Sequence, residues 1–241
     1  MPLGTIFKKN PYVHPADILG DIDVNELKGT KVTFINLPIR EQAVPNNPPM
    51  GPALIAARLQ KYGVEVQIID LNAYRIKDDI AKSRNLTNGR VFTYNEAKQF
   101  LADNFQKYGD QDLIGFSGLI TTLKWQGEVA KMIRQLQPQA LLASGGGLAT
   151  EFREILFHWI PELDAIAHSE GEDVILKMAY DARIIRNKGL KQAELSGKLA
   201  PYILGIHNGR PRFSYDGGRP KDLDNIPFIL PHTLLMFFAT I

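Results

Sequence analysis

The sequence contains no cysteine. This absence excludes disulfides, thiolate metal sites, cysteine nucleophiles and cysteine-held iron-sulfur clusters within these residues. An excess of one charge is missing as well, because 28 Lys and Arg against 26 Asp and Glu leave a formal net charge of +2. Without a dense basic cluster we expect no nucleic-acid partner. No apolar run reaches the roughly 20 residues that span a bilayer, and no signal-peptide core is present, so we expect a cytoplasmic protein without a membrane partner.

The composition is that of an ordinary globular protein, with 44% hydrophobic and 22% charged residues in a chain of 241. The pattern divides the chain into three segments. Residues 1–30 carry several prolines and predict an N-terminal arm, and residues 31–186 predict one α/β domain. Residues 187–241 predict an extension towards a further domain, because the closing apolar segment Leu234–Ile241 has no evident helix stop.

Within residues 31–186, short β-branched apolar runs alternate with helix-like patterns. The runs predict five strands, at residues 31–37, 64–71, 113–117, 140–144 and 163–168. The helix patterns begin near Leu54, behind a Thr93/Glu96 capping box, after Thr121 and Thr122, near Thr150 and near Glu172. Regular alternation with short connections predicts a doubly wound, parallel, five-stranded sheet of the flavodoxin or Rossmann type.

A different pattern follows residue 187. Residues 203–207 and 210–215 flank Asn208-Gly209, which predicts a hairpin with a tight turn. Pro211 cannot donate to a β-ladder, so we expect it to confine the second arm of this hairpin to a sheet edge. We interpret the hairpin as part of a short C-terminal extension that leaves the domain.

The loops that follow the predicted strands share one character. In an open parallel sheet, ligands bind at the carboxyl ends of the strands, where these loops meet. The loops are small, hydroxyl-bearing and rich in glycine, which suits close backbone approach to a flat or phosphorylated ligand. The candidate binding residues are Pro49, Gly51, Ser117, Gly118, Leu119, Thr121, Thr122, Gly145, Gly146, Gly147, Thr150, Glu170, Gly171 and Glu172.

The stretch SGGGLAT, which begins at Ser144, allows several interpretations. Gly145, Gly147 and Thr150 nearly trace a dinucleotide fingerprint, but they follow the fourth strand, and Thr stands where a small residue allows close helix packing. A phosphate-binding P-loop is excluded because no Lys-Ser or Lys-Thr pair closes the motif. A purely structural alternative is a tight strand-to-helix turn with Thr150 as the helix cap.

Four loops in order, PNNPPMG, SGLITT, GGGLAT and SEGE, give the sequence a wider resemblance. It resembles the cobalamin-binding domain that precedes the catalytic barrel in cobalamin-dependent radical SAM enzymes, over residues 31–186. Leu223–Pro227 (LDNIP) is similar to the linker that leads into that barrel. The resemblance implies cobalamin as the cofactor, with its nucleotide tail inserted between the Ser-x-Leu and the Gly-Gly loops.

The residue types suit such a tail. Gly145, Gly146 and Gly147 would leave a slot without side chains, and Ser117, Thr121, Thr122 and Thr150 would offer hydroxyls to ribose and phosphate oxygens. Glu170, Gly171 and Glu172 match the family's Gly-Glu-Gly-Glu element in part, since Ser169 replaces its first glycine. These carboxylates would equally well complement a helix dipole.

Two departures from the family limit the resemblance. The Asp-x-His-x-x-Gly run that places histidine under cobalt in other cobalamin proteins is absent, so no metal ligand is predicted. His168, at the end of the fifth strand, is a candidate contact on the cobalt side, with a hydrogen-bonded structural role as the alternative. The CxxxCxxC motif that binds the radical SAM cluster is also absent, so we expect no catalysis from this chain alone and, as its partner, a separately encoded radical SAM barrel.

Two alternative functions fit the same fold, and the first of them would use the same loops. A Rossmann-like oxidoreductase or transferase with a nucleotide cofactor would need an acid or base, for which Asp70 and Glu170 are the candidates. A receiver-type signalling domain would need an acidic cluster at the first strand, where Asn36 and Leu37 stand.

Overall fold

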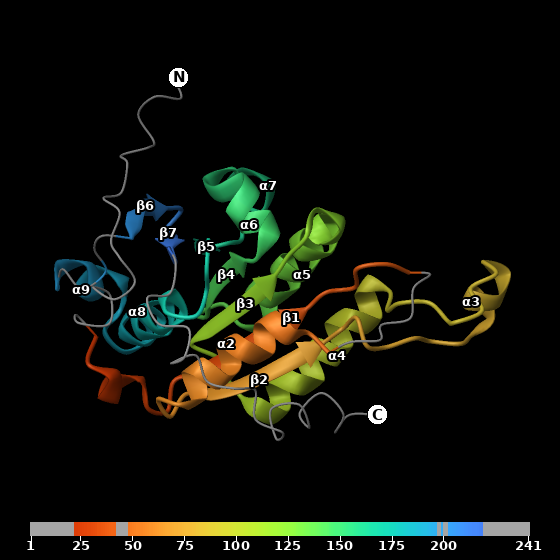
Figure 1. The fold of residues 1–241 in the computed structure, drawn as a ribbon, viewed down its shortest axis with the longest axis horizontal. Coiled ribbons are helices and arrows are strands. Elements are labelled where there is room, and N and C mark those ends of the chain that lie inside the picture. Colours follow the sequence, from red (N-terminus) through yellow and green to blue (C-terminus); the bar gives the residue numbers. More distant parts are fainter. Residues whose placement is uncertain (1–21, 42–47, 197–198, 200–201, 219–241) are drawn as a thin grey trace, which may run out of the picture.

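The computed structural model describes residues 22–41, 48–196, 199 and 202–218, which build one mixed sheet covered by helices (Figure 1). The sheet has seven strands in the order β2-β1-β3-β4-β5-β7-β6. Their bounds are β1 (Lys31–Asn36), β2 (Glu65–Asp70), β3 (Leu113–Ser117), β4 (Leu141–Gly145), β5 (Ala165–His168), β6 (Ile203–His207) and β7 (Arg210–Asp216). All neighbouring strands are parallel except β6 and β7.

The order of the strands reverses at β1. The chain first adds β2 on one side of β1 and then crosses over to place β3 on its other side. A doubly wound sheet with the order 2-1-3-4-5 has its topological switch point between β1 and β3, and a ligand crevice lies there. The sheet therefore directs attention to the loops that follow these two strands.

Helices cover both faces of the sheet. One face packs against η2 (Val24–Leu27), α2 (Met50–Gln60), α8 (Val174–Lys188) and α9 (Leu190–Leu195). The other face packs against α4 (Tyr94–Tyr108), α5 (Leu123–Leu136), α6 (Gly147–Phe152) and α7 (Leu156–Trp159). The strands are apolar on both faces, so Phe34 enters the first core and Ile35 the second.

Local signals in the sequence set several element ends. Thr93 and Glu96 form the predicted capping box: the Thr93 Oγ1 accepts from the Glu96 amide at 3.3 Å, and the Glu96 carboxylate accepts from the Thr93 amide at 2.7 Å. At the other end of α4, Gly109 has a φ of 76°, which L-residues rarely adopt. The capping prediction is therefore confirmed at residue level.

The sheet contains seven strands instead of the predicted five, because the hairpin of β6 and β7 joins it. The prediction that Pro211 confines its strand to an edge is wrong, since β7 lies between β5 and β6. The Phe213 amide donates to the Asp164 carbonyl. Because the backbone direction alternates along a strand, the backbone nitrogen of Pro211 points to the same side, towards β5. Pairing with β5, however, begins only at Phe213. Proline at this position therefore removes no hydrogen bond from the ladder.

The segment after β4 also differs from prediction. The helix begins at Gly147, with Gly146 at its N-cap, so Thr150 lies inside α6 and does not cap it. Arg153 has a φ of 46° and interrupts the helix, and a 3-10 turn, η4 (Arg153–Ile155), leads into α7. The N-terminal arm up to residue 21, the LDNIP stretch and Leu234–Ile241 lie outside the described residues.

Buried carboxylates hold the N-terminal ends of the strands. Asp164, fully buried before β5, accepts hydrogen bonds from the Leu142 amide at 2.8 Å and from Arg134 and Arg210. Asp112, before β3, accepts from the Lys31 amide at 2.8 Å. Each carboxylate thus connects neighbouring strands at the edge opposite to the predicted binding loops.

Candidate functional site

The loops that follow β3 and β4 lie against each other at the C-terminal edge of the sheet. The Gly118 amide donates to the Gly145 carbonyl at 3.1 Å, and the Leu148 amide donates to the Gly118 carbonyl at 2.9 Å. The Ser-x-Leu and Gly-Gly stretches, 27 residues apart when counted from Gly118 to Gly145, are therefore direct neighbours. We call this edge, with the loops after β1, β3, β4 and β5, the C-terminal rim.

Two of the rim glycines lie so close to neighbouring atoms that a side chain would not fit. A Cβ atom at Gly118 would lie 1.7 Å from the Gln126 Nε2, and one at Gly146 would lie 3.1 Å from the Ser117 Oγ. Gly146 also has a φ of 79°. These two glycines are thus required by the fold itself, whatever the rim binds.

Three other glycines of the rim have room. A Cβ atom at Gly145 would meet no atom closer than 3.7 Å, and the same distance holds for Gly147. At Gly51, in the first turn of α2, a Cβ atom would meet nothing within 4 Å. Because the fold does not need glycine at these positions, they leave space that side chains would otherwise fill.

The hydroxyl groups of the rim divide into two kinds. Ser117, Thr121 and Thr150 are exposed, and the Thr150 Oγ1 accepts from the Ser169 amide at 3.2 Å. Thr122 is 2% exposed, and its hydroxyl binds the amide and the carbonyl of Leu119 at 3.1 and 2.8 Å. Thr122 therefore closes its own turn, and the three other hydroxyl-bearing residues of the rim, Ser117, Thr121 and Thr150, are exposed.

Apolar side chains are exposed beside the switch point. Ile39 and Met50 follow β1, and Leu119 and Ile120 follow β3, with exposed fractions of 37, 53, 50 and 58%. Leu119 is among the residues predicted from the sequence, whereas Ile39, Met50 and Ile120 are not. The signal that would have found them is an isoleucine or methionine inside a loop of prolines and glycines, where no core position is available.

The loop after β5 is pressed against the end of β7. The Glu170 amide donates to the Gly218 carbonyl at 3.4 Å, and a Cβ atom at Gly217 would lie 1.5 Å from the Glu170 carbonyl oxygen. Glu172 precedes α8, and its Oε2 is buried without a hydrogen-bond partner among the described residues. Gly171 lies close to Ile55, since a Cβ atom there would be 3.0 Å from its Cδ1.

His168 is the last residue of β5, beneath the rim, and its side chain lies against β7. Its side chain is almost buried, with the Nδ1 3.6 Å from the Asp216 carboxylate and the Nε2 3.5 Å from the Ser214 hydroxyl. Burial lowers the pKa of His168 from its ordinary value of 6.5, although Asp216 acts in the opposite direction. The imidazole is therefore buried against Ser214 and Asp216 of β7.

The candidate acid or base Asp70 is occupied by structural contacts. Its carboxylate accepts from the Asn36 side chain at 2.8 Å and from the Asn72 amide at 2.9 Å. Burial raises the pKa of Asp70 above its ordinary value, with these hydrogen bonds opposing the shift. An aspartate held in this way is a poor partner for the ribose of a nucleotide cofactor.

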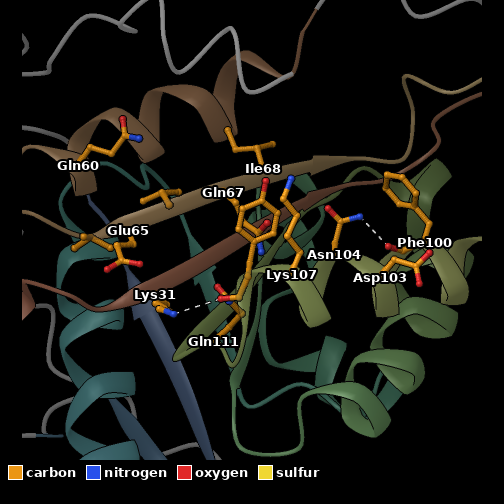
Figure 2. Close-up of a pocket in the computed structure, with 13 residues that line it drawn as sticks. Lys31, Gln60, Glu65, Gln67, Ile68, Phe100, Asp103, Asn104, Lys107 and Gln111 are labelled. Atoms are coloured by element: carbon orange, nitrogen blue, oxygen red, sulfur yellow. Dashed lines mark hydrogen bonds between the residues drawn. The ribbon is translucent and has the colours of Figure 1, made fainter. Parts of the chain in front are cut away.

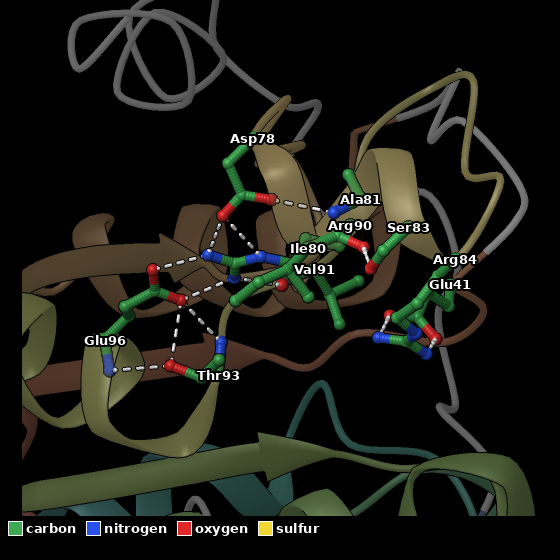
Figure 3. Close-up of polar contacts among 10 residues, drawn as sticks. All are labelled: Glu41, Asp78, Ile80, Ala81, Ser83, Arg84, Arg90, Val91, Thr93 and Glu96. Atoms are coloured by element: carbon green, nitrogen blue, oxygen red, sulfur yellow. Dashed lines mark hydrogen bonds and ion pairs between the residues drawn. The ribbon is translucent and has the colours of Figure 1, made fainter.

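A segment between β2 and α4 projects beyond the rim and carries α3 (Asp79–Ser83) at its far end (Figure 1). Arg90 holds it: the guanidinium donates to Asp78 at 2.6 Å and to Glu96 at 2.6 Å, as Figure 3 shows. These contacts lower the pKa of Glu96 to about 2. Arg84 pairs with Glu41, which connects the projection to the segment after β1. The projection is therefore a fixed feature beside the rim.

A cavity of about 620 Å³ lies away from the rim, along the outer edge of β2. The described residues contain no group of three or more metal-ligating side chains placed to hold an ion. In the same part of the chain, no helix has the length and apolarity that a membrane span requires.

The fold is similar to part of two solved enzymes that bind cobalamin. The radical S-adenosylmethionine methyltransferase TsrM from Kitasatospora setae, solved with cobalamin and a 4Fe-4S cluster, aligns over 66% of this chain and 27% of its own, at 16% identity and a TM-score of 0.50. TsrM with tryptophan and a SAM analog aligns over 77% and 30%, at 16% identity and a TM-score of 0.53. The cobalamin-dependent radical enzyme OxsB, solved with aqua-cobalamin and S-adenosylmethionine, aligns over 80% and 23%, at 18% identity and a TM-score of 0.52.

This likeness concerns the fold. The chain spans less than a third of the length of each of these enzymes. No family model and no curated protein matches the sequence.

Proposed function

We propose that this chain is a cobalamin-binding module and that the C-terminal rim holds the cofactor. The observation that carries the proposal is the direct contact of the Ser117–Leu119 and Gly145–Gly147 loops beside the switch point. The fold shared with TsrM and OxsB supports it, because both were solved with cobalamin. A sheet of this topology offers its ligand crevice at the same edge.

The rim residues fit the chemistry of the group. Gly145 and Gly147 keep space open where the fold itself would tolerate side chains. Exposed hydroxyls at Ser117, Thr121 and Thr150 can bind ribose and phosphate oxygens. Exposed apolar side chains, such as Leu119 and Ile120, lie on the same rim. A corrin ring bound there would cover these side chains and remove their apolar surface from water.

The role of this chain is then to bind and orient the cofactor. Bound cobalamin supplies a cobalt ion that can carry a methyl group. The rim would fix the nucleotide tail through its hydroxyls, and Leu119 and Ile120 would exclude water from the bound cofactor. Ligands for an iron-sulfur cluster would have to come from outside these 241 residues, because the sequence has no cysteine. We therefore propose that a radical SAM barrel acts together with this module.

Binding of hydroxocobalamin tests the proposal. The chain is incubated with hydroxocobalamin and passed through gel filtration, and visible absorbance is read across the protein peak. We expect a coloured peak with one cobalamin per chain. A colourless peak, at a protein concentration well above the micromolar range, contradicts the proposal.

A pair of glycine variants locates the site. Gly147→Leu adds a side chain at the rim where the nearest atom to its Cβ is 3.7 Å away, so the fold should persist while the crevice is filled. Gly127→Leu adds the same side chain on α5, outside the rim loops, at a position with nothing within 4 Å. We expect Gly147→Leu to weaken cobalamin binding at least tenfold and Gly127→Leu to leave it unchanged. Equal affinities for both variants would place the cofactor elsewhere.

A further inference from the structure

The two edge strands of the sheet differ in how they are protected. β6 is irregular, with a register shift between Ile203 and Gly205, and Gly205 has a φ of 151°. β2 is regular over all six residues and pairs in continuous register with β1. Natural proteins blunt exposed sheet edges with bulges, prolines or lysines, and within β2 (EVQIID) none of these occurs.

The outer side of β2 presents backbone groups for pairing. The Glu65 amide donates to the Thr30 carbonyl, and the Leu71 amide donates to the Asn36 carbonyl. The backbone N–H and C=O groups of every second residue of β2 therefore point towards β1. The amides and carbonyls of Val66 and Ile68 consequently point away from β1. Among the described residues, no partner accepts or donates to them.

A groove follows this edge. The cavity of about 620 Å³ is lined by five consecutive residues, 64–68, together with Gln60 of α2 and Phe100, Asn104 and Tyr108 of α4 (Figure 2). Successive side chains of a strand point to opposite faces, so five lining residues in a row indicate a cavity that follows the backbone along the edge of the strand. The groove is thus shaped for another extended strand between the two helix layers.

The charges around the groove are balanced. Lys31 and Lys107 line it together with Glu65 and Asp103. Asp103 and Lys107 are four residues apart on α4 and both are exposed, so they lie on the same side of the helix. A second, antiparallel α4 would place its own Lys107 near Asp103 and its own Asp103 near Lys107. Such mutual pairing is what an interface with twofold symmetry requires.

We propose that β2 pairs antiparallel with β2 of a second copy of this chain, so that the two sheets become continuous. The twofold axis passes through Gln67. In this register the backbone groups of Val66, which point away from β1, pair with those of Ile68 in the other copy. In the same register, α4 of one copy runs antiparallel to α4 of the other, as the charges favour. The proposal does not depend on cobalamin binding.

The register gives a sharp test, because the chain has no cysteine of its own. In the proposed dimer, Gln67 of one copy lies directly opposite Gln67 of the other. The two residues form a non-hydrogen-bonded pair, and the side chains of such a pair approach each other closely. Under mild oxidation, Gln67→Cys should form a disulfide-linked dimer in most of the protein. Glu65→Cys should not, because residue 65 and its copy would be about 13 Å apart along the strands. Gln135→Cys, on the exposed side of α5, controls for random collision.

The association itself is measured on the unmodified full chain by sedimentation velocity over a range of concentrations. We expect reversible dimers, and for Gln67→Lys a roughly fivefold weaker association, because two lysines would then face each other across the axis. Gln135→Lys should dimerise like the unmodified chain. A chain that stays monomeric, with no disulfide at position 67, overturns the proposal. Protection of the Val66 and Ile68 amides from hydrogen exchange in a dilute monomer also overturns it, since another part of the same chain would then cover β2.

Discussion

The two ends of the parallel strands are built from different chemistry. At the N-terminal ends, Asp112 and Asp164 are buried carboxylates that bind backbone amides and arginines. At the C-terminal ends, the loops carry small, largely uncharged residues. The loops contact each other through backbone hydrogen bonds, such as those of Gly118 with Gly145 and with Leu148. The difference indicates that one end fixes the strands in register and that the other end is available for a ligand.

The contrast has a physical basis. A carboxylate such as Asp164 is costly to bury unless it is fully paired, and here the Leu142 amide and two arginines surround it. Burial lowers the pKa of Arg134 to about 10, while Asp164 acts in the opposite direction. A network of this kind leaves no bonding capacity for a ligand. Glycines at the rim, by contrast, keep backbone groups accessible without adding charge.

The largest expected effect is at the N-terminal end. Asp164→Ala leaves Arg134 and Arg210 without their buried partner, so we expect the free energy of unfolding to fall by about 3 to 5 kcal/mol. Urea unfolding followed by circular dichroism measures this change. Asp110→Ala, which removes an exposed carboxylate paired with Arg186, should change it by less than about 0.5 kcal/mol. A small effect of Asp164→Ala would remove the contrast between the two ends.

A glycine pair on adjacent elements should give an intermediate effect. Gly118→Ala places a Cβ atom 1.7 Å from the Gln126 Nε2, and Gln126 is buried and bonded to Ser144 at 2.9 Å. We expect a loss of about 1 to 3 kcal/mol in the free energy of unfolding. Gly127→Ala, in the middle of α5 with free space around it, should gain up to about 1 kcal/mol. If both variants gained stability, Gly118 would not be constrained by the fold.

The smallest expected effect is on the pH dependence of stability. Because the pKa of His168 is lowered in the folded protein, the unfolded chain takes up a proton first as the pH falls below 6.5. Folding stability should therefore decrease as the pH falls below 6.5, and His168→Gln should flatten this decrease. The difference between the two curves isolates the imidazole from Asp181, whose pKa is raised to about 6 by burial. Replacement of the exposed His158 by Gln should leave the profile unchanged, and an equal flattening there would contradict the assignment.

Much of the fold could be predicted from local patterns. The capping box at Thr93 and the third strand, Leu113–Ser117, agree residue by residue with the structure, because their signals are contained in a few neighbouring residues. The place of β7 could not be predicted in this way. Whether Pro211 disrupts a ladder depends on where pairing with β5 begins, and that is a property of two strands whose paired residues, such as Ala165 and Phe213, are 48 positions apart.

The candidate site shows the same division. Glycines and hydroxyls at strand ends could be recognised in the sequence, since the loops of a parallel sheet meet at one edge. Their individual roles could not be recognised. Gly118 and Gly146 are demanded by contacts with Gln126 and Ser117, and the Thr122 hydroxyl is used within its own turn.

The sequence by itself determined the alternation of strands and helices and the edge at which the small residues gather, because both follow from periodicity and chain direction. Only the tertiary structure decided that the hairpin enters the sheet, that no other described strand pairs with the outer edge of β2 and that His168 is covered by β7. The physical reason is that burial and pairing depend on neighbours distant in the chain, whose positions no local pattern specifies.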